Sequence, residues 1–300
     1  MATLRYVITF GLACMSLASG WQAKAQAPEK LPVVATFSIL ADFARNVGGE
    51  RIEVTALVGP NGDTHVYQPK PADAKELGAA RLILVNGLGL EGWIDRLIKA
   101  SGAKAPVIVA TKGINPQKMR EEGRIGLDPH AWQSIANANI YVANIRDGLI
   151  AADPVGEAAY RTNAENYLAK LDTLEKEVLA EIAKIPPGRR QIITTHDAFG
   201  YFGAAYGFRF IAPEGISTET EASARDVAKI IRQIKTQKIP AVFLENVTDP
   251  RLVRSIAAES GAKIGGTLYS DALSPPDGPA STYIDMVRNN VRELSAALAN

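Results

Sequence analysis

The 300-residue chain is poor in cysteine and histidine, with one cysteine, Cys14, and three histidines. Because a disulfide needs two cysteines, none can form within the chain. The net charge of +1 leaves no strongly basic surface and no acidic tail, so nucleic acid is excluded as a partner. The fold must therefore be held together by an apolar core and by any metal it binds.

Hydrophobic runs long enough to cross a membrane are also lacking. Residues 1–25 are predicted to be a secretory signal peptide, because a positive start precedes the apolar residues 6–18 and an Ala-x-Ala cleavage site ends the segment. Lipid attachment at Cys14 is the alternative, although no aliphatic residue stands three positions before it. Cleavage after residue 25 predicts a periplasmic protein without cysteine.

The mature chain contains short apolar runs that alternate with helical patterns on both sides of one long segment. In residues 153–186 apolar side chains recur at steps of three and four, and Asp153-Pro154 is a typical helix start, with Asp153 as the N-cap. This pattern predicts an α/β protein with two parallel-sheet lobes joined by a single long, rigid helix. The expected organisation is a signal peptide (1–25), an N-terminal lobe (26–152), a linking helix (153–186) and a C-terminal lobe (187–300). Residues 111–126 are expected to form a loop.

Each of the three histidines stands at the end of a predicted strand or in the loop beyond it. His65 follows the strand at 51–58, His130 follows the loop at 111–126, and His196 follows the strand at 191–195. Each has an aspartate one or two residues away, which could accept the second ring N–H of a metal-bound imidazole or could cap a turn. Because ligands bind beyond the carboxyl ends of strands in open α/β sheets, we expect the three imidazoles to meet in the cleft between the lobes.

A fourth metal ligand is expected from the C-terminal lobe. Asp271 follows the last predicted strand, and Glu245 ends the strand at 241–245. Asp271 is the favoured ligand and Glu245 the alternative, since either carboxylate could instead stabilise a turn or cap a helix.

The motifs around these residues resemble those of the metal-binding solute receptors of ABC-type uptake transporters. The matching segments span the mature chain: residues 65–67, 128–132, 195–202, 215–219 and 268–273. The resemblance implies two lobes joined by one long helix, with His65, His130, His196 and Asp271 as the metal ligands. It further implies a monomeric receptor that delivers a divalent metal ion to an ABC transporter membrane permease.

The resemblance does not by itself identify the metal, so the choice of metal is predicted from the four ligands. Three imidazoles and one carboxylate suit Zn²⁺, whereas relatives that prefer Mn²⁺ or Fe²⁺ commonly have Glu where His196 stands. The prediction is therefore Zn²⁺ as the transported ligand, with Mn²⁺ or Fe²⁺ as the alternative. A zinc-dependent hydrolase is a further alternative, but a catalytic zinc keeps a position open for water, and four protein ligands favour a receptor over an enzyme.

Overall fold

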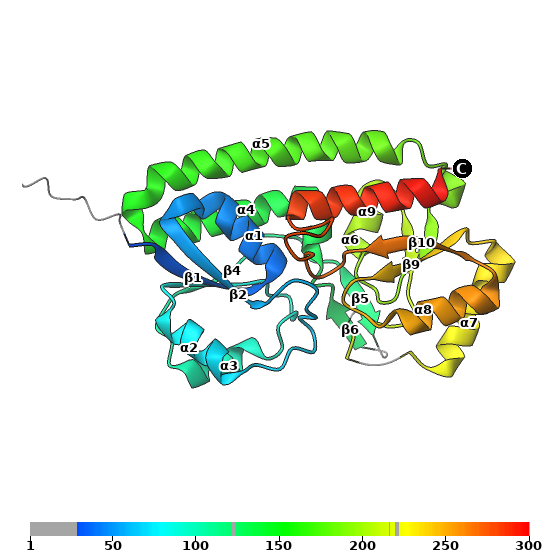
Figure 1. Cartoon of the computed structure of the whole chain (residues 1–300), viewed down its shortest axis with the longest axis horizontal. Coiled ribbons are helices and arrows are strands. Elements are labelled where there is room, and N and C mark those ends of the chain that lie inside the picture. The colour runs from blue at the N-terminus through cyan, green and yellow to red at the C-terminus, as the bar shows by residue number, and fades with distance from the viewer. Residues whose placement is uncertain (1–28, 122–123, 216, 220–221, 300) are drawn as a thin grey trace, which may run out of the picture.

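The computed structural model describes residues 29–121, 124–215, 217–219 and 222–299, so the predicted signal peptide and Cys14 lie outside the described residues. Two four-stranded parallel sheets form the centres of two lobes (Figure 1). The first sheet has the order β2-β1-β3-β4, and its strands are β1 (Leu31–Phe37), β2 (Ile52–Val58), β3 (Leu82–Val85) and β4 (Val107–Val109). The second has the order β10-β9-β7-β8, and its strands are β7 (Gln191–Ile193), β8 (Arg209–Ile211), β9 (Ala241–Glu245) and β10 (Lys263–Leu268).

Helices cover both sheets. In the first lobe they are α1 (Ser38–Gly48), α2 (Pro71–Ala79), α3 (Ile94–Ser101) and α4 (Ile135–Ala152). In the second lobe they are α6 (Gly200–Tyr206), α7 (Ala224–Gln237), α8 (Pro250–Ser260) and α9 (Tyr283–Leu298). Strands β1 and β3 are buried along nearly their whole length, as expected of parallel strands packed on both faces. The predicted fold class is confirmed, while the residue boundaries assigned to the lobes stay predictions.

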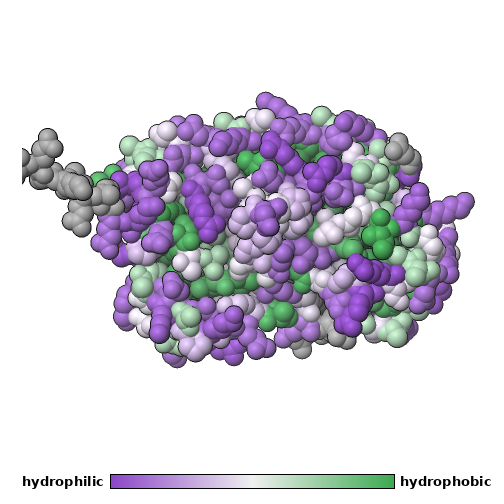
Figure 2. Space-filling model, viewed as in Figure 1, coloured by the Kyte–Doolittle hydropathy of each residue, from purple (hydrophilic) through white to green (hydrophobic). Residues whose placement is uncertain are grey.

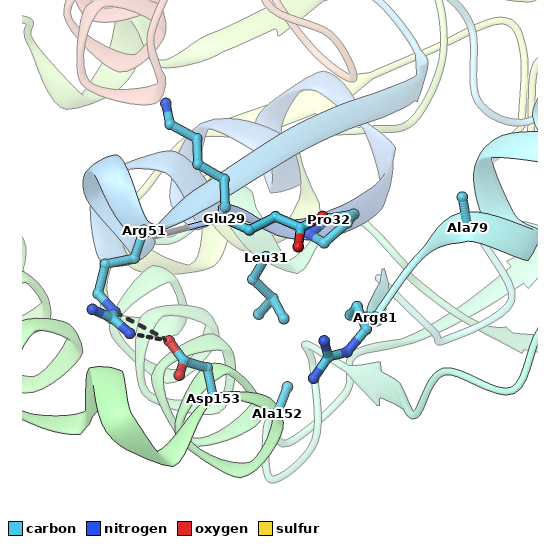
Figure 3. A pocket seen from close by; sticks show the side chains of 9 residues that line it. Glu29, Leu31, Pro32, Arg51, Ala79, Arg81, Ala152 and Asp153 are labelled. Atoms are coloured by element: carbon cyan, nitrogen blue, oxygen red, sulfur yellow. Dashed lines mark hydrogen bonds and ion pairs between the residues drawn. The ribbon is translucent and has the colours of Figure 1, made fainter. Parts of the chain in front are cut away.

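Helix α5 (Glu157–Ile182) joins the lobes and lies beside α9 along one side of the molecule (Figure 1). Its 26 residues make it shorter than the predicted segment, because residues 154–156 form a 3₁₀ turn before it. Asp153 is the N-cap residue of the 3₁₀ turn rather than of α5, and its side chain makes no capping hydrogen bond. The Asp153 carboxylate instead accepts hydrogen bonds from Arg51, at 2.8 and 3.0 Å (Figure 3). It also accepts a hydrogen bond from the Tyr160 hydroxyl. The contact with Arg51 attaches the start of the linking helix to the first sheet.

The prediction that residues 111–126 form a loop is only partly correct. Strands β5 (Lys118–Glu121) and β6 (Arg124–Leu127) pair antiparallel within it and lead directly into the Asp128-Pro129-His130 turn. Each strand has only four residues, and β5 (Lys-Met-Arg-Glu) has no alternation of apolar and polar residues, so the hairpin could not be recognised from periodicity.

The largest hydrophobic core is continuous across both lobes and includes the buried face of α5, from Tyr160 to Ile182. A smaller core lies under α7 and α8 in the second lobe. Hydrophilic residues cover most of the surface shown in Figure 2, with apolar residues scattered between them. Across the described residues, no helix combines the length and apolar character needed to span a bilayer.

Candidate metal centre

His65 is placed by the loop that follows β2. The Asp63 carboxylate accepts a hydrogen bond from the backbone N–H of His65 at 2.9 Å, so Asp63 shapes the turn. Asp63 therefore stabilises the turn before His65, rather than accepting a hydrogen bond from the imidazole ring. The Nε2 atom of His65 lies 3.1 Å from Nε2 of His130.

His130 is completely buried in the turn that follows β6. Oδ1 of Asp128 lies 2.7 Å from its Nδ1 and also accepts its backbone N–H at 2.9 Å. Asp128 is therefore the acceptor expected for a metal-binding imidazole, because it leaves Nε2 of His130 free of a proton.

His196 is also completely buried, just beyond β7. Its Nδ1 lies 2.6 Å from Oε2 of Glu245, the last residue of β9. The other oxygen of Glu245 accepts the backbone N–H groups of Thr195 and His196. The carboxylate next to Nδ1 of this imidazole is thus that of Glu245, at ion-pair distance, rather than that of the neighbouring Asp197, and Glu245 lies behind His196 rather than among the four grouped side chains.

Asp271 lies in the loop after β10, and its side chain is completely buried. Its Oδ2 lies 3.1 Å from Nε2 of His196 and 3.3 Å from Nε2 of His65, and its Oδ1 lies 3.6 Å from Nε2 of His130. The loop is held in place because Trp132 and Gln133 both donate side-chain hydrogen bonds to the carbonyl of Ser270.

The structure thus brings together the four predicted ligands, His65, His130, His196 and Asp271, with one ligand atom of each within 4.8 Å of the others. Four ligands on a tetrahedral zinc ion, at bond lengths of about 2.0–2.1 Å, would stand about 3.3–3.4 Å from one another. The Nε2 atoms of His65 and His130 lie 3.1 Å apart, and Oδ2 of Asp271 lies 3.1 Å from Nε2 of His196 and 3.3 Å from Nε2 of His65, which is close to that spacing. Among the described residues, Oδ1 of Asp271 has no hydrogen-bond partner. A buried carboxylate oxygen without a donor favours a bound cation.

The electrostatics of the four grouped side chains also favour a bound cation. Burial by itself lowers the pKa of His196, but the carboxylates of Glu245 and Asp271 outweigh it and hold this pKa well above its ordinary value. Burial acts to raise the pKa of Asp271, whereas the imidazoles of His196 and His130 hold it well below its ordinary value. The centre therefore favours positive charge beside Asp271, which either a proton or a metal ion can supply.

Three comparisons with known proteins all match proteins named for metal binding or metal uptake. Residues 33–297 match the family model described as zinc-uptake complex component A, periplasmic. The manganese-binding lipoprotein MntA of Halalkalibacterium halodurans is 35% identical over 271 residues, which cover 90% of this chain and 89% of that protein. The iron-binding protein YfeA of Yersinia pestis is 34% identical over 295 residues, 98% of this chain and 94% of that protein. The solved structure of the periplasmic zinc-binding protein TroA from Treponema pallidum superposes with a TM-score of 0.85 at 31% identity, covering 91% of this chain and 100% of that one.

Proposed function

The chain belongs to the family of periplasmic zinc-uptake components, the metal-binding receptors of ABC transporters, and from this membership we propose that its cargo is Zn²⁺, bound by His65, His130, His196 and Asp271. Members of this family are solute-binding proteins rather than enzymes. A divalent metal ion and the membrane part of an ABC transporter are therefore the partners of this chain. We further propose that it acts as a monomer, that residues 1–25 are removed on export, and that its two lobes comprise residues 26–152 and 187–300.

The observation that carries the proposal is that four ligand side chains drawn from both lobes meet, with one ligand atom of each within 4.8 Å of the others. Three of these atoms are imidazole nitrogens, which suit Zn²⁺ better than the oxygen-rich sites that Mn²⁺ prefers. Both buried imidazoles have a carboxylate on Nδ1, which keeps Nε2 available for the metal. Solvent reaches little of the group, because the side chain of His65 is 5% exposed and those of the other three are 0% exposed.

Manganese is the second candidate, because several relatives are named as manganese-binding. Affinity in solution cannot decide between the two metals, since most nitrogen and oxygen sites bind Zn²⁺ more tightly than Mn²⁺. Elemental analysis of the protein purified from its own compartment decides it. We expect one zinc ion per chain, and one manganese ion instead would show that the cargo is Mn²⁺.

The ligand assignment is tested with Asp271→Ala and a matched control, Asp277→Ala, which changes an exposed aspartate in the same loop. We expect calorimetry to show Zn²⁺ affinity lowered by orders of magnitude in the first variant and unchanged in the second. His130→Ala should behave as Asp271→Ala does. Unchanged affinity in both Asp271→Ala and His130→Ala would refute the assignment.

A further inference from the structure

The loop between β2 and His65 is hydrogen-bonded to the second lobe through its backbone and its side chains. The backbone N–H of Asn61 donates to the carbonyl of Leu273 at 2.9 Å. The Asn61 side-chain oxygen accepts a hydrogen bond from the Asn246 amide at 3.1 Å. Two residues further on, Oδ2 of Asp63 accepts a hydrogen bond from the Thr218 hydroxyl at 2.6 Å. Asn61 and Asp63 belong to the first lobe, whereas Asn246 and Thr218 follow strands β9 and β8 of the second.

Asp63 uses its two oxygens for different lobes. Oδ1 accepts the backbone N–H of His65 at 2.9 Å, and Oδ2 accepts the hydroxyl of Thr218. A single carboxylate therefore connects the backbone of a predicted metal ligand to the opposite lobe. If Thr218 moves away with the second lobe, the turn that places His65 loses one of its supports.

Asn246 makes the corresponding connection for Asp271. Its side chain accepts the backbone N–H of Ser270 at 3.3 Å and donates to the carbonyl of Ala272 at 3.1 Å, so it contacts the chain on both sides of Asp271. The same amide donates to Asn61. His65 is thus supported by a hydrogen bond between the lobes, whereas Asp271 is supported by Asn246, which itself bonds to Asn61 of the first lobe.

We propose that these contacts form a latch, closed by the Thr218 hydroxyl on Asp63, and that opening of the latch sets the rate at which the metal leaves. Thr218 is then a positioning residue, because it acts on the metal through the turn that carries His65. The inference rests on the proposed function, since it needs ligands from both lobes. A metal ion held by both lobes can leave only after those ligands separate, and the interlobe hydrogen bonds must break first.

The surroundings of the latch suit a contact that opens reversibly. Asp63 and Thr218 line a surface pocket that is also formed by Glu214, Val247 and Asp249. Thr218 is only partly buried, so water can replace its hydrogen bond when the lobes separate. A hydrogen bond near water contributes less than a buried one, but an interaction with a carboxylate is stronger than one between neutral groups.

The test compares Thr218→Val, which replaces the hydroxyl by a methyl group of similar size, with Thr218→Ser, which keeps the hydroxyl. The matched control is Thr236→Val, because Thr236 is an exposed threonine of the same lobe whose hydroxyl bonds within its own helix. Zn²⁺ is loaded onto each protein, and its release into an excess of a strong chelator is followed by stopped flow. We expect roughly tenfold faster release from Thr218→Val, as the loss of one hydrogen bond to a charged group would cause.

We expect Thr218→Ser and Thr236→Val to release zinc at the wild-type rate, and the metal-free melting temperatures of all variants to agree. Release from Thr218→Val within twofold of wild type would overturn the latch. So would equally fast release from Thr218→Ser, or faster release that is accompanied by a lower metal-free melting temperature than that of Thr236→Val. Failure of the wild-type protein to bind zinc would instead refute the proposed function, so the two failures are distinguishable.

Discussion

His130 and His196 each place one ring nitrogen against a buried carboxylate, and the choice of carboxylate differs between them. Asp128 lies two residues before His130, whereas Glu245 reaches His196 from a different strand. In each case the carboxylate favours a proton on Nδ1, and Nε2 is the atom that faces the other ligands and can bind the metal. The metal affinity should therefore depend on residues that do not touch the metal.

Glu245→Gln tests that dependence. The backbone N–H groups of Thr195 and His196 would retain the amide oxygen, which turns the amide NH₂ toward Nδ1 of His196 and favours a proton on Nε2. We expect zinc affinity to fall about 10- to 100-fold in a chelator competition assay. Glu259→Gln, an exposed change on α8, should leave affinity unchanged, and equal affinities of the two variants would contradict this role for Glu245.

Zinc affinity should also depend on pH. An imidazole must be neutral to bind metal, and the ordinary pKa of a histidine side chain is about 6.5, so protons should compete with the metal increasingly as pH falls from about 7 to 5. Because nearby carboxylates raise the pKa of His196, competition at this residue should begin at higher pH. Competition titrations across this range should show affinity decreasing steadily toward acid. An affinity independent of pH would mean that the histidines are not ligands.

Asp42 should make the metal-free protein less stable at neutral pH. Burial raises its pKa from 3.8 to about 6, although it accepts the backbone N–H of Tyr283. The folded state therefore binds this proton more tightly than the unfolded state, and stability is lost as pH rises from about 4 to 6. Asp42→Asn keeps the acceptor and should remove that loss, about 3 kcal/mol for a shift of about two units. Denaturant unfolding at pH 4 and 7 measures this loss of stability, and the exposed Asp95→Asn serves as the control. Similar pH dependence of stability in Asp42→Asn and Asp95→Asn would contradict the prediction.

At the scale of elements, α5 is attached at both ends to the lobes it joins. Its start is held by the Arg51–Asp153 ion pair, and the side chain of Arg190 donates to the carbonyls of Ile182 and Ile185 beyond its last turn. Such donors satisfy carbonyls that have no partner within a helix. A linking helix fixed at both ends is poorly suited to act as a hinge, which favours local movement at the interlobe loops during metal release.

The contribution of α5 to stability can be measured with two leucines of the same helix. Leu171 is 0% exposed in the main core, whereas Leu179 is 51% exposed. Leu171→Ala should lower the free energy of unfolding by about 2–5 kcal/mol, because it removes buried surface and leaves a cavity. Leu179→Ala should change it by less than about 0.5 kcal/mol. Chemical denaturation of the metal-free variants checks both values, and a similar loss in each would show that α5 is not packed as described.

At the scale of the whole molecule, the metal should stabilise both lobes together. A metal that binds only the folded state adds about 4 kcal/mol when its free concentration is about a thousand times the dissociation constant. We expect zinc to raise the melting temperature of the wild-type protein in a single transition, and to raise that of Asp271→Ala much less. Magnesium serves as the control, since it prefers oxygen ligands. Two separate transitions, with only one shifted by zinc, would contradict a site shared by both lobes.

Sequence alone was sufficient for the alternation of strands and helices, the linking helix, and the location of His65, His130 and His196 beyond strand ends. These features depend on hydrophobic periodicity and on turn residues, which are local along the chain. The position of Asp271 after the last predicted strand already favoured it as the fourth ligand, and the resemblance to metal receptors added the cargo class. Zinc as the particular metal stays a prediction, because ligand type limits the choice of metal without determining it.

Tertiary structure decided which distant groups meet. It placed Glu245 behind His196 and Asp271 in front of it, although both carboxylates lie at or just beyond the ends of strands of the same sheet. It also turned Asp63 toward the Thr218 hydroxyl, and it paired β5 with β6 in a segment without a periodic pattern. These outcomes depend on strand order, the approach of the lobes and the direction of each side chain. All three arise from packing between segments far apart in the chain, which a local pattern does not contain.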